Sequence, residues 1–378
     1  MEANTKRCAS FRPHSASFFH AKLLSLTFTA ATMNISFPNY HDAQPATDFD
    51  RQTLAFVQEW FSETETVQVQ TSGSTGTPKI LEMEKDRMRH SARMTCRFLG
   101  LQAGDSALLC LPVAYISGKM MVVRAIEQQL KLMVSEPSVR PLEHLAQTVD
   151  FCALTPLQVE HSLDKLHLIR NIIIGGAAVS AALKVKIQDV LEGQEKKVKI
   201  YETYGMSETL SHIALKEIFP KAAPDFTVLS GVQISLDPRG CLQILAPQLS
   251  AELIVTNDLV ELTGTNSFIF QGRYDNVINS GGLKIFPEQL ETLVHTVTDR
   301  ELAFLGLPDE QLGQKLVLAI EGGESSVLTD DIRHLTFPTR NHLPKEIIFI
   351  PEFPRTPNGK VSRLELLNIL KSNERFHQ

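Results

Sequence analysis

The sequence predicts an α/β protein with a large N-terminal domain, which has parallel-type sheets and a small β subdomain, and a small α+β C-terminal domain. Two observations support this prediction. Short apolar runs alternate with helical patterns as far as about residue 201, and several β-type runs without intervening helices follow. Such alternation is typical of a largely parallel sheet covered by helices. A chain of 378 residues with 43 % hydrophobic content can hold two domains.

The first elements are defined by caps and periodicity. Asp50 is expected to cap a helix over 51–62, and Gly100 is expected to close a second helix over 85–99. Strands then alternate with helices. The expected strands are 67–70, 106–111, 131–135, 151–154, 172–174 and 198–201, and further helices are expected to follow Pro141, Pro156 and Ser180. Because ligands of such sheets bind at the carboxyl ends of the strands, motifs at these ends are site candidates.

The later chain divides into two expected parts. Short β-type runs over 225–255 predict the β subdomain. Pro287 is expected to begin a helix, and Ser362 with Glu365 forms a capping box for the last helix. We expect the large domain to span 33–274 and the small one 275–378. Residues 1–32 resemble a signal peptide faintly, but we expect a disordered segment or a start assigned too early.

Composition excludes several classes of protein. A net charge of −6 favours neither nucleic acid nor a membrane surface, and no apolar run approaches the ~20 residues of a membrane helix. The five cysteines form no C-x-x-C pair, which argues against a disulfide framework or a zinc site and fits a reducing cytosol. We therefore expect a cytoplasmic protein that acts on small molecules. The sequence leaves open whether the chain forms a homo-oligomer.

A loop rich in hydroxyls and glycine follows the strand 67–70. It contains Thr71, Ser72, Gly73, Ser74, Thr75, Gly76 and Lys79. Glycine lets backbone N–H groups approach an anion, hydroxyls donate hydrogen bonds and lysine supplies charge, so the loop suits phosphate. It is not a Walker A loop, because Pro78 stands where that motif needs its second glycine. The alternative is a surface turn, but the preceding strand and the Pro-Lys pair argue against it.

Further chemistry-bearing residues recur along the chain. The stretch YGMSET presents the aromatic Tyr204, the hydroxyl of Ser207 and the carboxylate of Glu208, which suits Mg²⁺ beside phosphates and waters. A solvated surface acid is the alternative for Glu208. The remaining candidates lie in the strand-to-helix turn after 174 and in the stretches TNDLV, GRYDNVINSGGLKI and PRTPNGK; they are Gly175, Gly176, Ala177, Asp258, Arg273, Asp275, Gly281, Gly282, Lys284 and Lys360.

From about Thr71 to Arg363 these stretches resemble, in the same order, the adenylate-forming superfamily of acyl-CoA ligases, luciferases and peptide-synthetase adenylation domains. The resemblance implies that the loop 71–79 binds the phosphates of ATP, Glu208 binds Mg²⁺ and Lys360 is catalytic. It also implies that the turn 175–177 and Tyr204 contact adenine, and that Asp258 and Arg273 hold ribose. Asp275 would be the hinge of a mobile small domain, and Gly281, Gly282 and Lys284 would face the site when the thioester forms.

The sequence departs from the family at two places. The family's aromatic–histidine pair corresponds to Ala114-Tyr115, and Asn257 replaces a glycine. Asparagine tolerates the left-handed region, so we expect a turn to survive at Asn257. The acyl pocket is expected to involve Tyr115, Ser117, Lys119 and His212, although Tyr115 is equally explained as a core tyrosine, Lys119 as a solvated lysine and His212 as an incidental histidine.

The resemblance implies an ATP-dependent carboxylate–CoA ligase that works through an acyl-adenylate and uses ATP, Mg²⁺ and coenzyme A. The short segment before the phosphate loop and the stretch LPVAYISGKMM are most similar to the o-succinylbenzoate–CoA ligases of menaquinone biosynthesis. The alternatives are another acyl- or aryl-CoA ligase and a protein that loads acyl groups onto a separate carrier. A non-catalytic adenylate-binding protein would not need Lys360 and Glu208.

Overall fold

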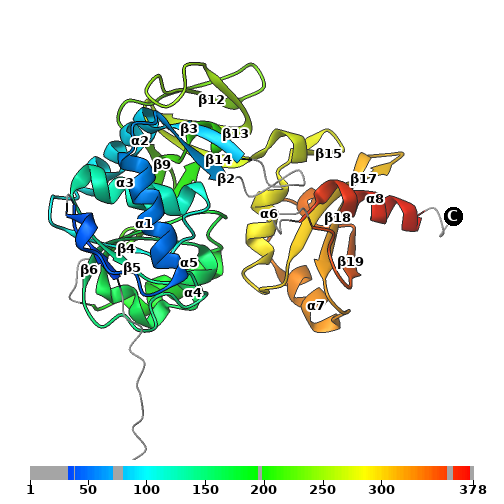
Figure 1. Ribbon diagram of the computed structural model, residues 1–378. Helices are drawn as coiled ribbons and strands as arrows, with labels where there is room; N and C mark the ends of the chain where they lie inside the picture. The colour runs from blue at the N-terminus through cyan, green and yellow to red at the C-terminus, as the bar shows by residue number, and fades with distance from the viewer. Residues whose placement is uncertain (1–32, 38, 71–79, 195–197, 356–360, 375–378) are drawn as a thin grey trace, which may run out of the picture. The chain divides into compact units, whose positions relative to one another are not determined.

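The structure, a computed structural model, describes residues 33–37, 39–70, 80–194, 198–355 and 361–374 (Figure 1). One large sheet dominates the described residues up to Arg273. Its first half is, in spatial order, β1 (Met33–Ile35), β5 (Lys131–Val134), β4 (Ser106–Leu109), β6 (Val149–Leu154), β7 (Ile169–Ile174) and β8 (Lys199–Gly205). Strands β4 to β8 are parallel, and β1 is antiparallel at the edge. The expected parallel sheet is therefore present.

The second half of the same sheet is antiparallel. It continues with β9 (His212–Phe219), β10 (Phe226–Val228), β14 (Ser267–Arg273), β13 (Ile254–Gly264), β12 (Cys241–Leu245) and β11 (Gln233–Leu236). The short strands expected over 225–255 are β10 to β12. Strand β10 lies inside the large sheet between β9 and β14, and β12 and β11 form its far edge. The structure confirms the α/β fold class.

Helices cover both faces of the parallel half. One face packs against α1 (Asp48–Phe61), α2 (Lys85–Leu99) and α3 (Ile116–Gln128), and the other packs against η2 (Leu163–Leu168) and α5 (Ala181–Leu191), with α4 (Pro156–Glu160) nearby. Residues of one strand alternate between the two cores, since Phe151 belongs to the first and Cys152 to the second. Parallel strands buried on both faces read as continuous apolar runs, which explains why the sequence displays them clearly.

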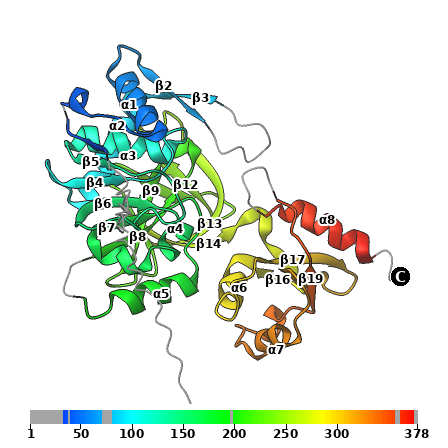
Figure 2. The same cartoon turned by 60° about the horizontal axis from the view of Figure 1, so that its bottom comes forward.

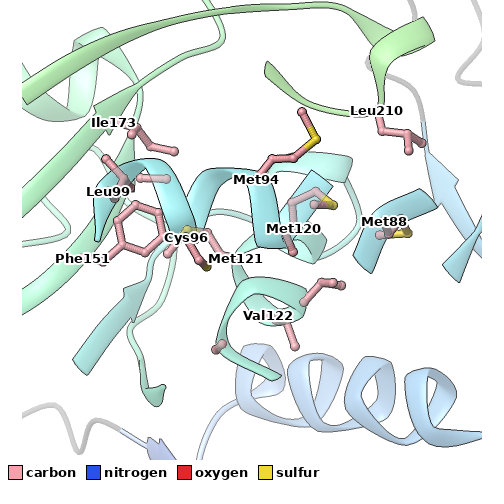
Figure 3. Packing of buried hydrophobic residues seen from close by; sticks show 14 of the residues in the cluster. Met88, Met94, Cys96, Leu99, Met120, Met121, Val122, Phe151, Ile173 and Leu210 are labelled. Carbon is pink, nitrogen blue, oxygen red and sulfur yellow. The ribbon is translucent and has the colours of Figure 1, made fainter. Parts of the chain in front are cut away.

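The core of the first face is formed where α2 and α3 meet the sheet. Figure 3 shows the residues involved, which are Met88, Met94, Cys96 and Leu99 of α2, Met120, Met121 and Val122 of α3, and Phe151 and Ile173 of the sheet. Each large side chain buried here contributes about 1.5–3 kcal/mol to folding. All residues from Gly118 to Ala125 are buried, so α3 lacks the polar face by which a helix is recognised in a sequence, and it was not predicted.

A two-stranded hairpin carries the loop 71–79, which lies outside the described residues. It consists of β2 (Thr66–Gln70) and β3 (Ile80–Glu84), and Gln70 pairs with Ile80 at its end. The backbone N–H of Gln70 donates to the carbonyl of Ala114 at 3.1 Å. At the other end, the buried Lys85 ammonium donates to the Glu59 carbonyl at 2.8 Å and so binds the C-terminus of α1. Both ends of the hairpin are therefore attached to the large sheet's helical layer.

The chain beyond Tyr274 builds a second sheet. Its elements are β15 (Ile278–Ser280), β16 (Leu283–Ile285), α6 (Pro287–Val294), β17 (Leu302–Asp309), β18 (Gly313–Glu321), α7 (Ser326–His334), β19 (Glu346–Ile350) and α8 (Arg363–Glu374). Three further short 3₁₀ helices are described, which are η1 (Tyr40–Asp42), η4 (Tyr274–Asn276) and η5 (Arg340–His342). Alternate residues of β17 again face two cores, one with α6 and α7 and one with α8.

The expected domain boundary at 275 stays a prediction. Residues 1–32 lie outside the described residues, so their interpretation stays a prediction as well. The two sheets divide the chain between Arg273 and Ile278. Among the described helices, none is both long and apolar enough to cross a membrane.

Three local predictions are confirmed. Gly100 ends α2 with a φ of 65°, Ser180 caps α5 by accepting from the Leu183 N–H, and Pro287 begins α6. Two others are wrong. Thr47, not Asp50, caps α1, while the Asp50 carboxylate accepts from the Thr47 N–H at 2.9 Å in a capping box. No helix follows Pro141, because the chain makes only turns before β6.

The expected turn at Asn257 is also wrong. Asn257 lies inside the extended strand β13, and no left-handed backbone is found there. The Asn257 side chain makes two hydrogen bonds. Its amide nitrogen donates to Asp275 at 3.0 Å, and its amide oxygen accepts from Arg239 at 2.8 Å. Asparagine at this position therefore acts through its side chain and not through its backbone.

Gly118 provides a test of how α3 is seated. A Cβ at Gly118 would lie 2.6 Å from the carbonyl oxygen of Leu111 and still closer to that of Pro112. Alanine normally stabilises a helix interior by about 1 kcal/mol relative to glycine. We expect Gly118→Ala to reverse that sign and to lower the free energy of unfolding by about 1–3 kcal/mol, because overpacking dominates. Urea unfolding measures the change.

Gly323→Ala is the matched control. A Cβ at Gly323 meets no atom within 4 Å, so this variant should unfold within about 0.5 kcal/mol of the unsubstituted protein. Equal stability of the two variants would show that α3 does not require glycine at 118.

Candidate active site

A cavity of about 1210 Å³ opens at the carboxyl ends of the parallel strands. Figure 2 shows β4, β6, β7 and β8 side by side, and residues that follow or end each of them line the cavity. The cavity brings together many of the residues expected from the sequence, which are Tyr115, Ser117, Gly175, Gly176, Ala177, Tyr204, Ser207, His212 and Asp258.

Tyr204, Asp258 and Arg273 form one polar cluster. The Tyr204 hydroxyl donates to Asp258 Oδ2 at 2.6 Å, and a terminal nitrogen of Arg273 lies 3.5 Å from Asp258 Oδ1. Burial, and then the neighbouring Asp258 charge, raise the pKa of Tyr204, so the phenol stays a donor. The Tyr204 ring packs edge-on against the Phe268 ring, with 5.0 Å between the ring centroids. The cluster combines a fixed aromatic ring with a carboxylate whose remaining lone pairs can accept from hydroxyls.

The turn after β7 lies close to β8. The Gly175 N–H donates to the Leu154 carbonyl at 3.0 Å, and a Cβ at Gly175 would meet the Thr203 hydroxyl at 2.7 Å. Glycine is therefore needed at 175 for the turn to pack on β8. Gly176 adopts a φ of 88°, which favours glycine as well.

Ser207 and Glu208 lie on the single 3₁₀ turn η3 (Ser207–Thr209) directly after β8. Both side chains are exposed, and Ser207 but not Glu208 lines the cavity. Within the described ranges no group of three His, Cys, Asp or Glu residues is placed to hold a metal ion. A single exposed carboxylate fits Mg²⁺, which keeps several waters and takes its other ligands from substrate phosphates.

Sequence analysis missed Arg124, the most unusual cation of the cavity. Its side chain is 2 % exposed, lines the cavity, and donates to the Ser211 hydroxyl at 2.8 Å. Burial lowers the pKa of Arg124 to about 10, so the guanidinium remains charged at neutral pH. No carboxylate pairs with it among the residues that the structure describes, and its Nε has no hydrogen-bond partner there. An arginine inside the apolar run 120–125 was the available signal.

His212 lies beside Arg124 and is fully inside the protein. One ring nitrogen lies 3.0 Å from the Thr95 hydroxyl, and the other lies 3.4 Å from the Ser211 hydroxyl. Burial, and then the charge of Arg124, hold the pKa of His212 well below its ordinary value. The imidazole is therefore neutral, and Arg124 is the cation at this position.

The structure corrects the expectation for Lys119. Its side chain does not line the cavity but lies against α1, with its ammonium 4.0 Å from the centre of the Phe56 ring and 3.9 Å from Glu59. Helical geometry explains this, because Ser117 and Lys119 lie on different faces of α3. Tyr115 does line the cavity and is 38 % exposed, so the alternative of a core tyrosine is wrong.

The residues expected on the thioester side lie apart from the cavity lining. Asp275 is held by Asn257, while Gly281 and Gly282 form the turn between β15 and β16 with φ values of 58° and 82°, and Lys284 is exposed on β16. Neither Arg273 nor these four residues line the cavity as the structure has it. Thr71, Ser72, Gly73, Ser74, Thr75, Gly76, Lys79 and Lys360 lie outside the described residues.

Comparison with known proteins shows the family. The model of the AMP-binding enzyme family matches residues 30–234, which is more than half of the chain. A solved acyl-CoA synthetase (AMP-forming)/AMP-acid ligase II-like protein from Dyadobacter fermentans is 35 % identical, with 86 % of this chain and 95 % of that one covered and a TM-score of 0.59. The chain therefore belongs to the AMP-binding enzyme family. It is an enzyme of the AMP-forming acid–thiol ligase class.

More distant relatives carry a narrower name. The 2-succinylbenzoate–CoA ligase of Lactococcus lactis is 26 % identical over 78 % of this chain and 69 % of its own length, and that of Listeria monocytogenes serotype 4b is 23 % identical over 96 % and 81 %. The o-succinylbenzoate coenzyme A synthetase (MenE) of Bacillus subtilis, in complex with ATP and a magnesium ion, is 20 % identical. It covers 79 % of this chain and 69 % of its own, and its TM-score of 0.65 shows the same fold.

The position of Lys119 predicts how its removal affects activity. We expect Lys119→Met to leave the KM for the acid substrate and for ATP within about twofold, because its ammonium faces α1 and not the cavity. The free energy of unfolding should change by about 1 kcal/mol or less, since methionine can fill the space of the buried lysine stem and only a 3.9 Å ion pair with half-exposed Glu59 and a cation–π contact are lost. Steady-state kinetics and urea unfolding measure both. A tenfold loss of kcat/KM at normal stability would restore Lys119 as a substrate contact.

Proposed function

We propose that the protein is an ATP-dependent carboxylate–CoA ligase that activates o-succinylbenzoate through an acyl-adenylate, as a step of menaquinone biosynthesis in the cytosol. Three facts support the proposal. The family uses AMP-forming chemistry, several relatives are named 2-succinylbenzoate–CoA ligase, and the four described cysteines are buried free thiols. The observation on which the choice of acid rests is the Arg124 guanidinium in the cavity.

Arg124 favours an acid that carries a second anionic group. Leaving a buried charge without a counter-ion costs several kcal/mol, so a cavity that retains one is suited to a ligand that neutralises it. A monocarboxylic acid uses its single carboxylate in the reaction. A dicarboxylic acid can place one carboxylate beside ATP and the other against the guanidinium, in a charge-assisted hydrogen bond. Aromatic o-succinylbenzoate has two carboxylates, and the apolar Leu81, Met83, Leu111 and Ile116 of the lining suit its ring.

The first half-reaction would join the acid to AMP. A carboxylate oxygen attacks the α-phosphorus of ATP, the bond from that phosphorus to the bridging oxygen breaks, and pyrophosphate leaves with the electron pair. Positioning and positive charge catalyse such steps. Lys360 would bridge the carboxylate and the α-phosphate, the loop 71–79 would hold the departing phosphates, and Tyr204, Asp258 and Arg273 would hold the nucleoside. Mg²⁺ supplies charge neutralisation on the phosphates when bound, and Glu208 is the residue that would hold it.

The second half-reaction would transfer the acyl group to CoA. The thiol sulfur attacks the acyl carbon, the carbon–oxygen bond to AMP breaks, and the thiol proton passes to solvent. The face with Gly281, Gly282 and Lys284 would serve this step after a rotation about Asp275. No protein nucleophile is required. The buried free thiols of Cys96, Cys110, Cys152 and Cys241 therefore need no part in the reaction. A separate carrier thiol in place of CoA remains the second candidate acceptor.

The test is pyrophosphate release by the purified protein across a panel of acids, with ATP, Mg²⁺ and CoA. We expect release with o-succinylbenzoate and a CoA thioester product, and much weaker release with the analogue in which the ring carboxylate is replaced by hydrogen. Arg124→Met should lower kcat/KM for o-succinylbenzoate about 10- to 100-fold, since a charge-assisted contact is lost. Adenylate formation without a CoA product would favour a carrier, and equal rates with both acids would disprove the proposed substrate.

Glu208 is tested by its dependence on magnesium. We expect Glu208→Gln to raise the Mg²⁺ concentration needed for half-maximal pyrophosphate release by about tenfold or more, because one charged oxygen ligand is lost. The exposed position of Glu208 means that the unfolding midpoint should not change. Glu252→Gln, at an exposed acid remote from the cavity lining, is the control. An unchanged magnesium titration would remove Glu208 as the metal ligand.

A further inference from the structure

A chain of hydrogen bonds leads from Arg124 into the core. The guanidinium donates to the Ser211 hydroxyl at 2.8 Å, and the same hydroxyl lies 3.4 Å from Nδ1 of His212. Nε2 of His212 lies 3.0 Å from the Thr95 hydroxyl, which donates to the Ser91 carbonyl at 3.2 Å. Three elements are thereby joined, since Arg124 belongs to α3, Thr95 to α2, and His212 to β9.

The direction of every bond in this chain follows from chemistry. Arginine can only donate, so the Ser211 hydroxyl accepts from Arg124 and its own hydrogen is free for His212 Nδ1. The neutral imidazole then carries its hydrogen on Nε2 and donates to Thr95, whose hydrogen goes to the Ser91 carbonyl. Each hydrogen has one acceptor, so the chain is fully satisfied in one tautomer. A protonated His212 would break this order and place a second cation beside Arg124.

The backbone around Ser211 is held in a rare conformation. Leu210 has a φ of 63° and a ψ of −43°, and the Ser211 N–H donates to the Thr209 carbonyl at 2.6 Å, which defines a γ-turn. A non-glycine residue in such a turn is strained and persists only where its surroundings require it. Here the buried Thr209 hydroxyl holds the turn by donating to the Ser211 carbonyl at 2.7 Å. The strain therefore directs Ser211 toward Arg124.

Gly205 allows the same placement from β8. A Cβ at Gly205 would lie 2.5 Å from the Ser211 carbonyl oxygen and closer still to His212 Cα. The strand therefore approaches Ser211 and His212 as near as a backbone can. Both the turn and this approach fix the position of Ser211, which contacts Arg124.

We propose that Ser211 and His212 are positioning residues that hold the Arg124 guanidinium in the orientation required to bind the second anionic group of the acid. This inference rests on the proposed function, because it gives Arg124 that role. Ser211 occupies one terminal nitrogen of the guanidinium and is itself directed by neutral His212. The buried Nε has no hydrogen-bond partner among the described residues, and the other terminal nitrogen donates only a long bond of 3.9 Å to the Met121 thioether, so both retain the capacity to donate to an anion.

The experiment compares two acids in each variant, o-succinylbenzoate and its analogue without the ring carboxylate. The quantity measured is the ratio of their kcat/KM values for pyrophosphate release. Ser211→Ala should lower this ratio about tenfold or more through the KM for o-succinylbenzoate, while kinetics with the analogue change less than twofold. Ser211→Thr keeps the hydroxyl and should retain most of the ratio. Ser235→Ala, on the exposed β11, is the matched control with no expected change.

A second pair of variants keeps the inference testable where Ser211→Ala does not fold. In His212→Asn the amide oxygen can replace Nδ1 as the acceptor for Ser211, whereas His212→Leu removes it. We expect His212→Asn to retain a clearly higher ratio than His212→Leu. Equal ratios in these two variants would overturn the inference.

The outcomes separate the inference from the function on which it rests. If the unsubstituted protein shows no preference for o-succinylbenzoate over its analogue, the proposed substrate is disproved and the inference loses its basis. If the unsubstituted protein prefers o-succinylbenzoate and this preference is lost in Arg124→Met but kept in Ser211→Ala, the proposed substrate stands and only the positioning role of Ser211 is overturned. Equal losses with both acids would show a merely structural role, which also overturns it. Selective loss with the dicarboxylate, rescued by Ser211→Thr, would establish the positioning role.

Discussion

The parallel strands of the large sheet are buried on both faces, and this burial holds the edge that carries the cavity in place. Strands β4, β6 and β7 send alternate side chains into two separate cores, so they are fixed from both sides and cannot slide. Their carboxyl ends are therefore held at one edge of the sheet. Short turns follow the strands there, and the backbone groups of these turns come within reach of a ligand. The cavity lies at this edge.

Two kinds of group meet in the cavity, and their chemistry differs. The Tyr204 hydroxyl donates to the Asp258 side chain, and this aromatic donor and oxygen acceptor in contact suit the base and the hydroxyls of a nucleoside. Arg124 is a buried cation that no described carboxylate neutralises, which suits an anion. Residues 204–212 contact both groups, since Tyr204 at the end of β8 donates to Asp258 and Ser211, after the turn η3 and the γ-turn at Leu210, accepts from Arg124. One continuous segment thus carries both kinds of contact.

Much of the fold was predictable because it depends on local patterns. Apolar runs marked β4, β6 and β7, Gly100 and Ser180 marked helix ends, and motif residues marked the turns at Gly175 and Tyr204. Predictions failed where tertiary contacts replace local rules. Helix α3 is buried over most of its surface, its charged Lys119 and Arg124 included, Thr47 is the cap in place of Asp50, and Asn257 uses its side chain where a backbone effect was expected.

Residue types at short spacing are enough to predict the fold class and the motifs, and the resemblance of these motifs to a known family implies the AMP-forming chemistry. Tertiary structure alone decided which cations face the ligand. Lys119 and Arg124 lie five positions apart on α3, yet one packs over Phe56 and the other lines the cavity beside Ser211. No local pattern distinguishes them, since the difference arises from which neighbouring element covers each face of the helix.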